Sequence, residues 1–158
     1  MGLGFNANEI FEMAEQIERN GAAYYREAAE AVTNDADKKF LIELAEMEDD
    51  HEVTFGDLRK NLGADEKSEL TFDPEDEAAQ YLKALADTRV FYDKALDLSS
   101  MTGILKGAIT AEKDSIVFYL GMKDLVAGSR GKDRIDAIIK EEMKHIKLLS
   151  GRLMAIGK

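Results

Sequence analysis

The sequence contains no cysteine, no tryptophan and a single proline among its 158 residues. Without cysteine, the chain can form neither disulfides nor thiolate-bound zinc or iron–sulfur sites, and it has no cysteine nucleophile. Such a composition suits a reducing compartment, and we expect a cytoplasmic protein. Because Pro74 is the only proline, long helices are possible over most of the chain.

Basic residues are also scarce, with 21 Lys and Arg against 32 Asp and Glu and a formal charge of -11. This charge repels phosphate backbones and anionic lipid headgroups, so neither a nucleic acid nor a membrane is an expected partner. No apolar run approaches the roughly 20 residues needed to span a bilayer. With 45% hydrophobic residues, a chain of this length can bury its own core, and we expect one domain over residues 1–158.

Apolar residues recur at spacings of three and four, which predicts helices and not strands. Four long helices are expected. The first covers roughly residues 6–33, and the second begins after Asn34 and is stopped by Gly63. The third covers roughly 101–126, and a turn over 128–131 leads into the fourth, over roughly 133–154. The connections within the first pair and within the last pair are short, which makes the paired helices antiparallel neighbours. The connection between the pairs is too long for a tight turn, and Asp73 and Pro74 predict an extra helix within it. The pattern favours an all-α four-helix bundle with a long crossover connection.

The expected inner face of the second helix contains a carboxylate and an imidazole, Glu48 and His51, between leucines and phenylalanine. The fourth helix repeats this Glu-x-x-His pattern with Glu142 and His145, and the chain has no other histidine. Burying such groups without partners would be costly. The two motifs are therefore candidates for a buried site.

A shift of 94 residues superimposes one motif on the other, which predicts that the chain is an internally duplicated helical hairpin. The same shift relates further polar and aromatic residues on the inner faces. The related pairs are Glu18 and Glu112, Tyr25 and Tyr119, Glu48 and Glu142, and His51 and His145.

A single Glu-x-x-His on a helix is usually a solvated pair of neighbouring side chains. Two copies on inner faces, each preceded by an inward glutamate at the same distance, instead favour a shared chemical role. Two divalent cations would neutralise four glutamates and let them stay ionised when buried. Carboxylate and imidazole ligands without thiolate suit iron or manganese better than a structural zinc, although the pattern leaves the metal open.

Through these residues the chain resembles the ferritin-like di-iron carboxylate proteins, and the rubrerythrin family among them, over its four main helices. The resemblance implies two iron ions per chain, with manganese or zinc as alternatives. The implied ligands are Glu18 and His51 for one ion, Glu112 and His145 for the other, and Glu48 and Glu142 as bridges. Tyr25 and Tyr119 become candidates for hydrogen bonds to these ligands, the alternative being ordinary aromatic packing.

Two features depart from the rubrerythrin pattern. Ser115 stands one turn after Glu112, where family members often have an extra ligand glutamate, so we expect a symmetric six-ligand site as in bacterioferritin. We also expect no rubredoxin-like domain, because its iron needs four cysteines and the sequence has none. Electrons must then come from an external donor such as a rubredoxin.

The resemblance implies a non-haem di-iron oxidoreductase that reduces hydrogen peroxide or dioxygen in protection against oxidative stress. It also implies a homodimer or a larger homo-oligomer. A ferroxidase or iron-binding protein of the ferritin type would use the same six ligands. The sequence does not separate these two functions cleanly. A catalytically silent helical module that holds a structural metal is the third alternative.

Overall fold

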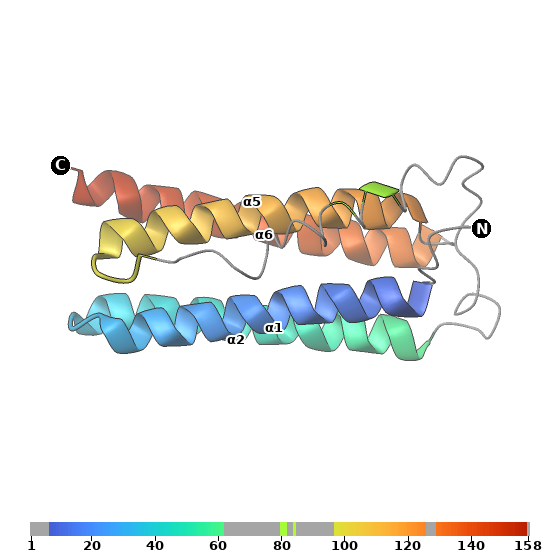
Figure 1. Ribbon diagram of the computed structural model, residues 1–158, viewed down its shortest axis with the longest axis horizontal. Helices are drawn as coiled ribbons and strands as arrows, with labels where there is room; N and C mark the ends of the chain where they lie inside the picture. Colours follow the sequence, from blue (N-terminus) through green and yellow to red (C-terminus); the bar gives the residue numbers. More distant parts are fainter. Residues whose placement is uncertain (1–6, 62–79, 82–83, 85–96, 126–128, 158) are drawn as a thin grey trace.

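The computed structural model describes residues 7–61, 80–81, 84, 97–125 and 129–157. Within these residues the long elements are four helices, and no strand is found (Figure 1). The helices are α1 (Ala7–Ala31), α2 (Asp35–Lys60), α5 (Met101–Leu125) and α6 (Ser129–Ile156). The predicted all-α bundle is confirmed. The predicted crossover helix after Pro74 lies almost wholly outside the described residues. Only residues 80–81 and 84 of this predicted helix are described, and they are helical.

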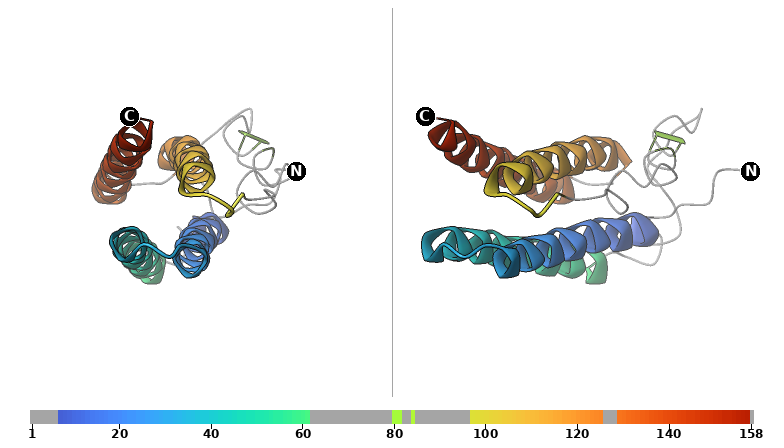
Figure 2. Two further views of the ribbon diagram at one scale, coloured as in Figure 1. Left: turned by 90° about the vertical axis from the view of Figure 1, so that its left-hand side faces the viewer. Right: turned by 60° about the vertical axis from the view of Figure 1, so that its left-hand side comes forward.

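The helices form two antiparallel hairpins, α1 with α2 and α5 with α6. Viewed end on, α5 lies beside α1 and α6 lies beside α2, so that the four helices occupy the corners of a quadrilateral (Figure 2). Contacts within each hairpin are far more extensive than contacts between the hairpins. The space between the hairpins is filled by inward side chains of all four helices, which together form the core.

The ends of α2 follow local rules of helix capping. The Asn34 side chain accepts a hydrogen bond from the backbone nitrogen of Asp37 at 2.9 Å, as expected of an N-cap residue. At the other end, Asn61 leaves the helical conformation, and its backbone nitrogen donates to the carbonyl of Asp57 at 3.1 Å. The helix thus ends at Lys60, and Gly63, the predicted stop, lies outside the described residues.

The start of α6 differs from the sequence prediction. The helix begins at Ser129, whereas the sequence suggested a turn over 128–131 and a helix from about Asp133. Gly131 inside the helix costs only about 1 kcal/mol relative to alanine. The added turn is held to α5 because Lys132 Nζ donates to the backbone oxygen of Lys123 at 2.8 Å.

The core consists of two apolar clusters with a layer of buried polar residues between them. Phe11, Phe55 and Phe118 belong to one cluster, and Leu41 and Ile104 belong to the other. On every helix, the buried polar residues fall between the residues of the two clusters, except for Glu15, which lies within the first cluster and pairs with Arg59 at 2.7 Å. The packing therefore places a polar layer near the middle of the bundle, away from both ends.

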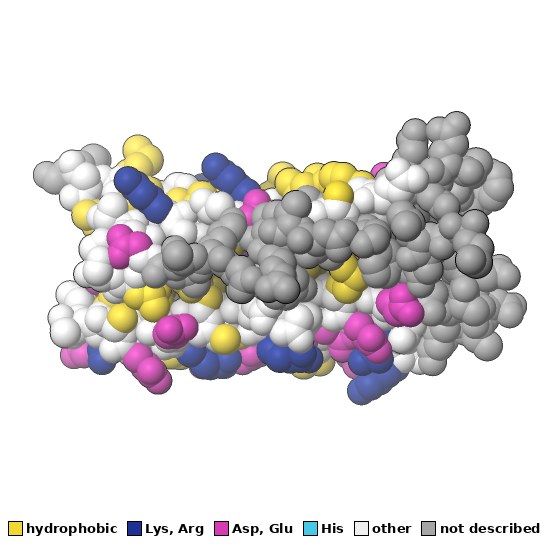
Figure 3. All heavy atoms as spheres, in the orientation of Figure 1, with side chains coloured by type: hydrophobic (Ala, Val, Ile, Leu, Met, Phe, Trp, Pro, Cys, Tyr) yellow, Lys and Arg dark blue, Asp and Glu magenta, His cyan; other side chains and the backbone are white. Residues whose placement is uncertain are grey.

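The outer surface of the first hairpin is charged. Figure 3 shows acidic and basic side chains interspersed along this part of the molecule, and no histidine among the coloured side chains of that face. Arg19 pairs with Glu52 at 2.7 Å across α1 and α2. Exposed pairs of this kind contribute at most about 1 kcal/mol each, so the apolar clusters dominate the stability. None of the described helices has the length and hydropathy to cross a membrane.

Candidate metal centre

Four glutamates and two histidines meet in the polar layer, and their side chains come from all four helices. Their exposed fractions lie between 1% and 4%. They are Glu18 on α1, Glu48 and His51 on α2, Glu112 on α5, and Glu142 and His145 on α6. The structure thus brings together all six of the ligands proposed from the sequence.

Helical periodicity explains how so few residues build the cluster. Side chains three residues apart lie on one face of a helix, so Glu48 and His51 point into the same space, as do Glu142 and His145. The helices α1 and α5 each add one glutamate from the neighbouring corner of the bundle.

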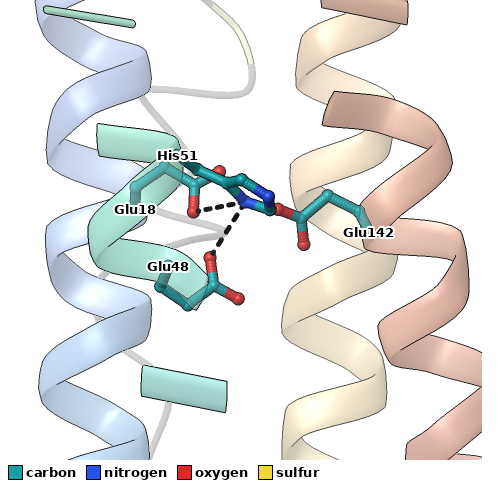
Figure 4. A group of neighbouring side chains, drawn as sticks. All are labelled: Glu18, Glu48, His51 and Glu142. Carbon is teal, nitrogen blue, oxygen red and sulfur yellow. Dashed lines mark ion pairs between the residues drawn. The ribbon is translucent and has the colours of Figure 1, made fainter. Parts of the chain in front are cut away.

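The six residues form two overlapping groups, in each of which the potential ligand atoms lie within 4.8 Å of one another. The first group, drawn in Figure 4, is Glu18, Glu48, His51 and Glu142. The second group is Glu48, Glu112, Glu142 and His145. Glu48 and Glu142 belong to both groups and therefore lie where the two groups overlap.

Both histidines direct Nδ1 at the carboxylates. His51 Nδ1 lies 2.7 Å from an oxygen of Glu142 and 3.5 Å from an oxygen of Glu18. His145 Nδ1 lies 3.4 Å from an oxygen of Glu112 and 3.5 Å from one of Glu142. The two rings stack, with centroids 5.6 Å apart and planes inclined by 18°. Their Nε2 atoms consequently face away from the four glutamates of the cluster.

Several polar atoms of the cluster are buried without a hydrogen-bond partner among the described residues. They are Glu18 Oε2, both carboxylate oxygens of Glu142, and Nδ1 of each histidine. Although His51 Nδ1 lies close to Glu142, the two groups do not have hydrogen-bond geometry. An unpaired buried polar group costs about 1–3 kcal/mol. Metal ions would satisfy these atoms, and the oxygen and nitrogen donors fit iron or manganese.

The electrostatics of the cluster also favour cations. Burial, followed by repulsion from Glu142, raises the pKa of Glu18 to about 7. Burial and the charges of Glu112 and Glu48 raise the pKa of Glu142 to about 8, and the pKa of Glu48 is raised well above its usual range for the same kind of reason. Burial raises the pKa of Glu112 too, but its close polar contacts with Glu142 and His145 outweigh burial and lower this pKa to about 2.

The histidines respond to the same negative charge. Burial alone lowers the pKa of His51, but contacts with Glu142 and Glu18 outweigh this effect and raise it to about 12. Burial is likewise outweighed at His145, mainly by Glu112 and Glu142, and its pKa is raised to about 12. Without metal, the cluster therefore retains protons that divalent cations would displace.

Two buried tyrosines connect the cluster across the hairpins. Tyr25 Oη on α1 donates to Glu112 Oε1 on α5 at 2.7 Å, and Tyr119 Oη on α5 donates to Glu18 Oε1 on α1 at 2.6 Å. Burial raises the pKa of both phenols well above the usual value, so they remain donors. Tyr119 also packs on Phe55 with ring centroids 5.0 Å apart. Hydrogen bonding and core packing, the two roles considered from the sequence, are thus combined.

The position of Ser115 adds no ligand to the cluster. Its hydroxyl donates to the backbone oxygen of Ala111 on the same helix at 2.9 Å. Its counterpart in the duplication is Gly21, where an added Cβ would lie 3.5 Å from the carboxyl carbon of Glu48. Neither repeat therefore supplies a further carboxylate one turn after Glu18 or Glu112.

The sequence analysis missed two residues that contact the outer nitrogens of the histidines. His51 Nε2 contacts the carboxylate of Glu141 on α6. His145 Nε2 lies 3.2 Å from the sulfur of Met47 on α2. Each of these residues immediately precedes a Glu-x-x-His motif, and the 94-residue shift superimposes Met47 on Glu141. That correspondence is the signal that could have identified them.

The antiparallel bundle and its buried carboxylate and histidine cluster define the class of ferritin-like four-helix proteins. Residues 9–153 match the family model Rubrerythrin, and the chain belongs to the rubrerythrin family. Membership of this family supports a diiron, metal-binding protein.

The fold is similar to that of a solved protein from Thermotoga maritima, which is described as a ferritin-like diiron-carboxylate protein. The two share 24% sequence identity over 96% of each chain, with a TM-score of 0.73. No curated protein sequence matches the chain.

Proposed function

We propose that the buried cluster holds two divalent metal ions, which are iron in the working protein. Glu48 and Glu142 would be shared between the ions, because each belongs to both groups of potential ligands. Glu18 and His51 would complete one position, and Glu112 and His145 the other. Four ionised carboxylates would then balance the charge of two divalent ions.

We further propose that the protein is an oxidoreductase that reduces hydrogen peroxide, or dioxygen, with electrons from an external donor such as a rubredoxin. A pair of iron ions cycling between the ferrous and ferric states would supply two electrons, and one peroxide with two protons then yields two waters. The supporting observation is the closure of the site, whose six residues are at most 4% exposed. Such burial suits a resident cofactor better than an ion in transit.

The other side chains of the site would keep the ligands in place. Tyr25 donates to one oxygen of Glu112, and Tyr119 donates to one oxygen of Glu18. The second oxygen of each of these glutamates is then left to bind metal. The apolar clusters on both sides limit the access of bulk water, with Phe55 and Phe118 fully buried. The chain would thus contribute orientation and a medium of low polarity.

The test is stopped-flow oxidation of protein loaded anaerobically with ferrous iron. Peroxide should oxidise the iron faster than dioxygen does, and the iron content should stay at two per chain. Glu142→Ala should abolish this reaction, whereas Glu43→Ala, which alters an exposed carboxylate on α2, should leave it unchanged.

The contrary outcomes point to the other two functions. If peroxide is no faster than dioxygen and iron accumulates beyond two per chain, the protein is a ferroxidase. If the protein retains only zinc and shows no oxidation after iron loading, the metal is structural. Either result would overturn the proposed reduction of peroxide.

A further inference from the structure

The duplicated site is symmetric in its inner residues but not in its outer ones. Around the carboxylates, each group of potential ligands has three glutamates and one histidine. Outside them, His51 Nε2 meets an anionic carboxylate and His145 Nε2 meets a neutral thioether, from Glu141 and Met47 respectively. Both contacts cross from α2 to α6. The outer pair is therefore the place where the two half-sites differ in chemistry.

The difference affects how strongly each imidazole can donate to a metal. When Nδ1 is the ligand atom, Nε2 keeps its proton and can donate it in a hydrogen bond. A carboxylate acceptor orients the ring, fixes this tautomer and raises the basicity of the ligating nitrogen. A thioether is only a weak acceptor. His51 should consequently be the stronger ligand of the two.

The exposure of the outer residues limits the size of the effect and makes it testable. The Glu141 side chain is 53% exposed and Met47 is 39% exposed. Water therefore screens the charge of Glu141, which places the effect at the lower end of the range for such contacts. Because neither side chain fills the apolar core, either can be substituted without leaving a large cavity.

Building on the proposed metal centre, we propose that Glu141 acts through His51 to make the two metal positions unequal, the position at His51 binding more tightly. Glu141 is in this sense a positioning residue, and Met47 is its weaker counterpart at His145. The sequence duplication has thus produced a site of two similar halves with different affinities.

The first experiment is titration of the full-length, metal-free protein with cobalt(II), followed by its visible absorption. Glu141→Ala should weaken the tighter binding step about tenfold, and Glu141→Gln, which retains an uncharged acceptor, should have a smaller effect. Met47→Glu should reduce the difference in cobalt affinity between the two binding steps. Two controls, Met47→Leu and the exposed Glu46→Gln, should change either step less than about twofold.

The second experiment uses the fact that the chain has only two histidines. In zinc-loaded protein labelled with nitrogen-15 histidine, each ring should give one N–H signal. The His51 proton should resonate well downfield of the His145 proton, because its acceptor is a carboxylate. Glu141→Gln should move the first signal upfield, and Met47→Glu should move the second downfield. A purely structural role of Glu141 would not produce these opposite changes in the two chemical shifts.

The outcomes separate this proposal from the proposed centre itself. If wild-type protein binds two cobalt ions per chain but Glu141→Gln and Glu141→Ala behave like Glu46→Gln in both experiments, the inequality is refuted and the centre stands. If wild-type protein binds no cobalt or zinc, both proposals fail. If the Glu141→Ala variant has lost its helical circular dichroism and is unfolded, the Glu141→Gln variant decides whether the two metal positions are unequal.

Discussion

Removal of the metal ions should make the stability of the fold fall as the pH rises from 5 to 7. In the folded protein the pKa of Glu18 is raised from 4.5 to about 7, and that of Glu142 from 4.5 to about 8, chiefly by burial. Between pH 4.5 and these values, the folded chain holds protons that the unfolded chain has released. Stability therefore decreases with increasing pH across this window.

The magnitude follows from the linkage between proton binding and folding. One extra proton held by the folded state costs about 1.36 kcal/mol for each pH unit. Glu18 and Glu142 are fully buried, so over two pH units each should contribute about 2 kcal/mol, or about 4 kcal/mol together. Glu48 and the two histidines act in the same direction, because burial raises the pKa of Glu48 well above 4.5 and the neighbouring carboxylates raise the pKa values of the histidines from 6.5 to about 12. The stability that Glu112 gains from its lowered pKa is lost only below about pH 4.5, outside the window.

The assay is urea unfolding followed by circular dichroism at pH 5, 6 and 7, with a chelator present or with iron bound anaerobically. The metal-bound protein should show the opposite trend, because metal competes with protons for the same atoms. Glu142→Gln removes one titrating group, so in the metal-free state its stability should fall by about 1 kcal/mol less per pH unit than that of the wild type. The same variant should be about 2 kcal/mol more stable than the wild type at pH 7 without metal.

The metal-free comparison can refute the reasoning directly. Stability that is constant or rising between pH 5 and 7 would show that the carboxylates are not held in a buried cluster. Equal melting temperatures with and without metal at pH 7 would count against ligation by these residues.

Three further changes test separate parts of the structure. Glu142→Ala should lose both metal ions and Glu112→Ala only one, because only Glu142 belongs to both ligand groups; equal losses in metal analysis would contradict the shared role. Tyr119→Phe should lower the free energy of unfolding by about 1–2 kcal/mol in urea, since Glu18 loses a donor at 2.6 Å, and an unchanged value would show that water replaces it. Asn34→Ala should lower the free energy of unfolding by about 1 kcal/mol, equally with and without metal, because α2 loses its N-cap, and Asn34→Asp should restore stability. A loss of stability that depends on metal would contradict the capping role of Asn34.

Much of the fold could be predicted from the sequence because its determinants are local. The spacing of apolar residues identified the four helices, and Asn34 marked the start of α2 correctly. The placement of Glu48 and His51 in an otherwise apolar stripe followed from the same periodicity. Because the histidines are so few, the repeated motif stood out against many acidic residues.

The missed features depend on tertiary geometry. Glu141 occupies an exposed position on its own helix, and only the packing of α6 beside α2 brings it to His51. Met47 likewise reaches His145 only across the hairpins. The early start of α6 rests on the contact of Lys132 with α5, which no rule for a local turn includes.

Anomalous diffraction at the iron edge, from crystals of the anaerobically iron-loaded protein, tests the central claim most directly. Two iron peaks are expected in each chain, both in contact with Glu48 and Glu142, one beside His51 Nδ1 and the other beside His145 Nδ1. A single peak, no peak, or iron bound only to exposed acidic residues would contradict the assignment of these six side chains as a two-metal centre.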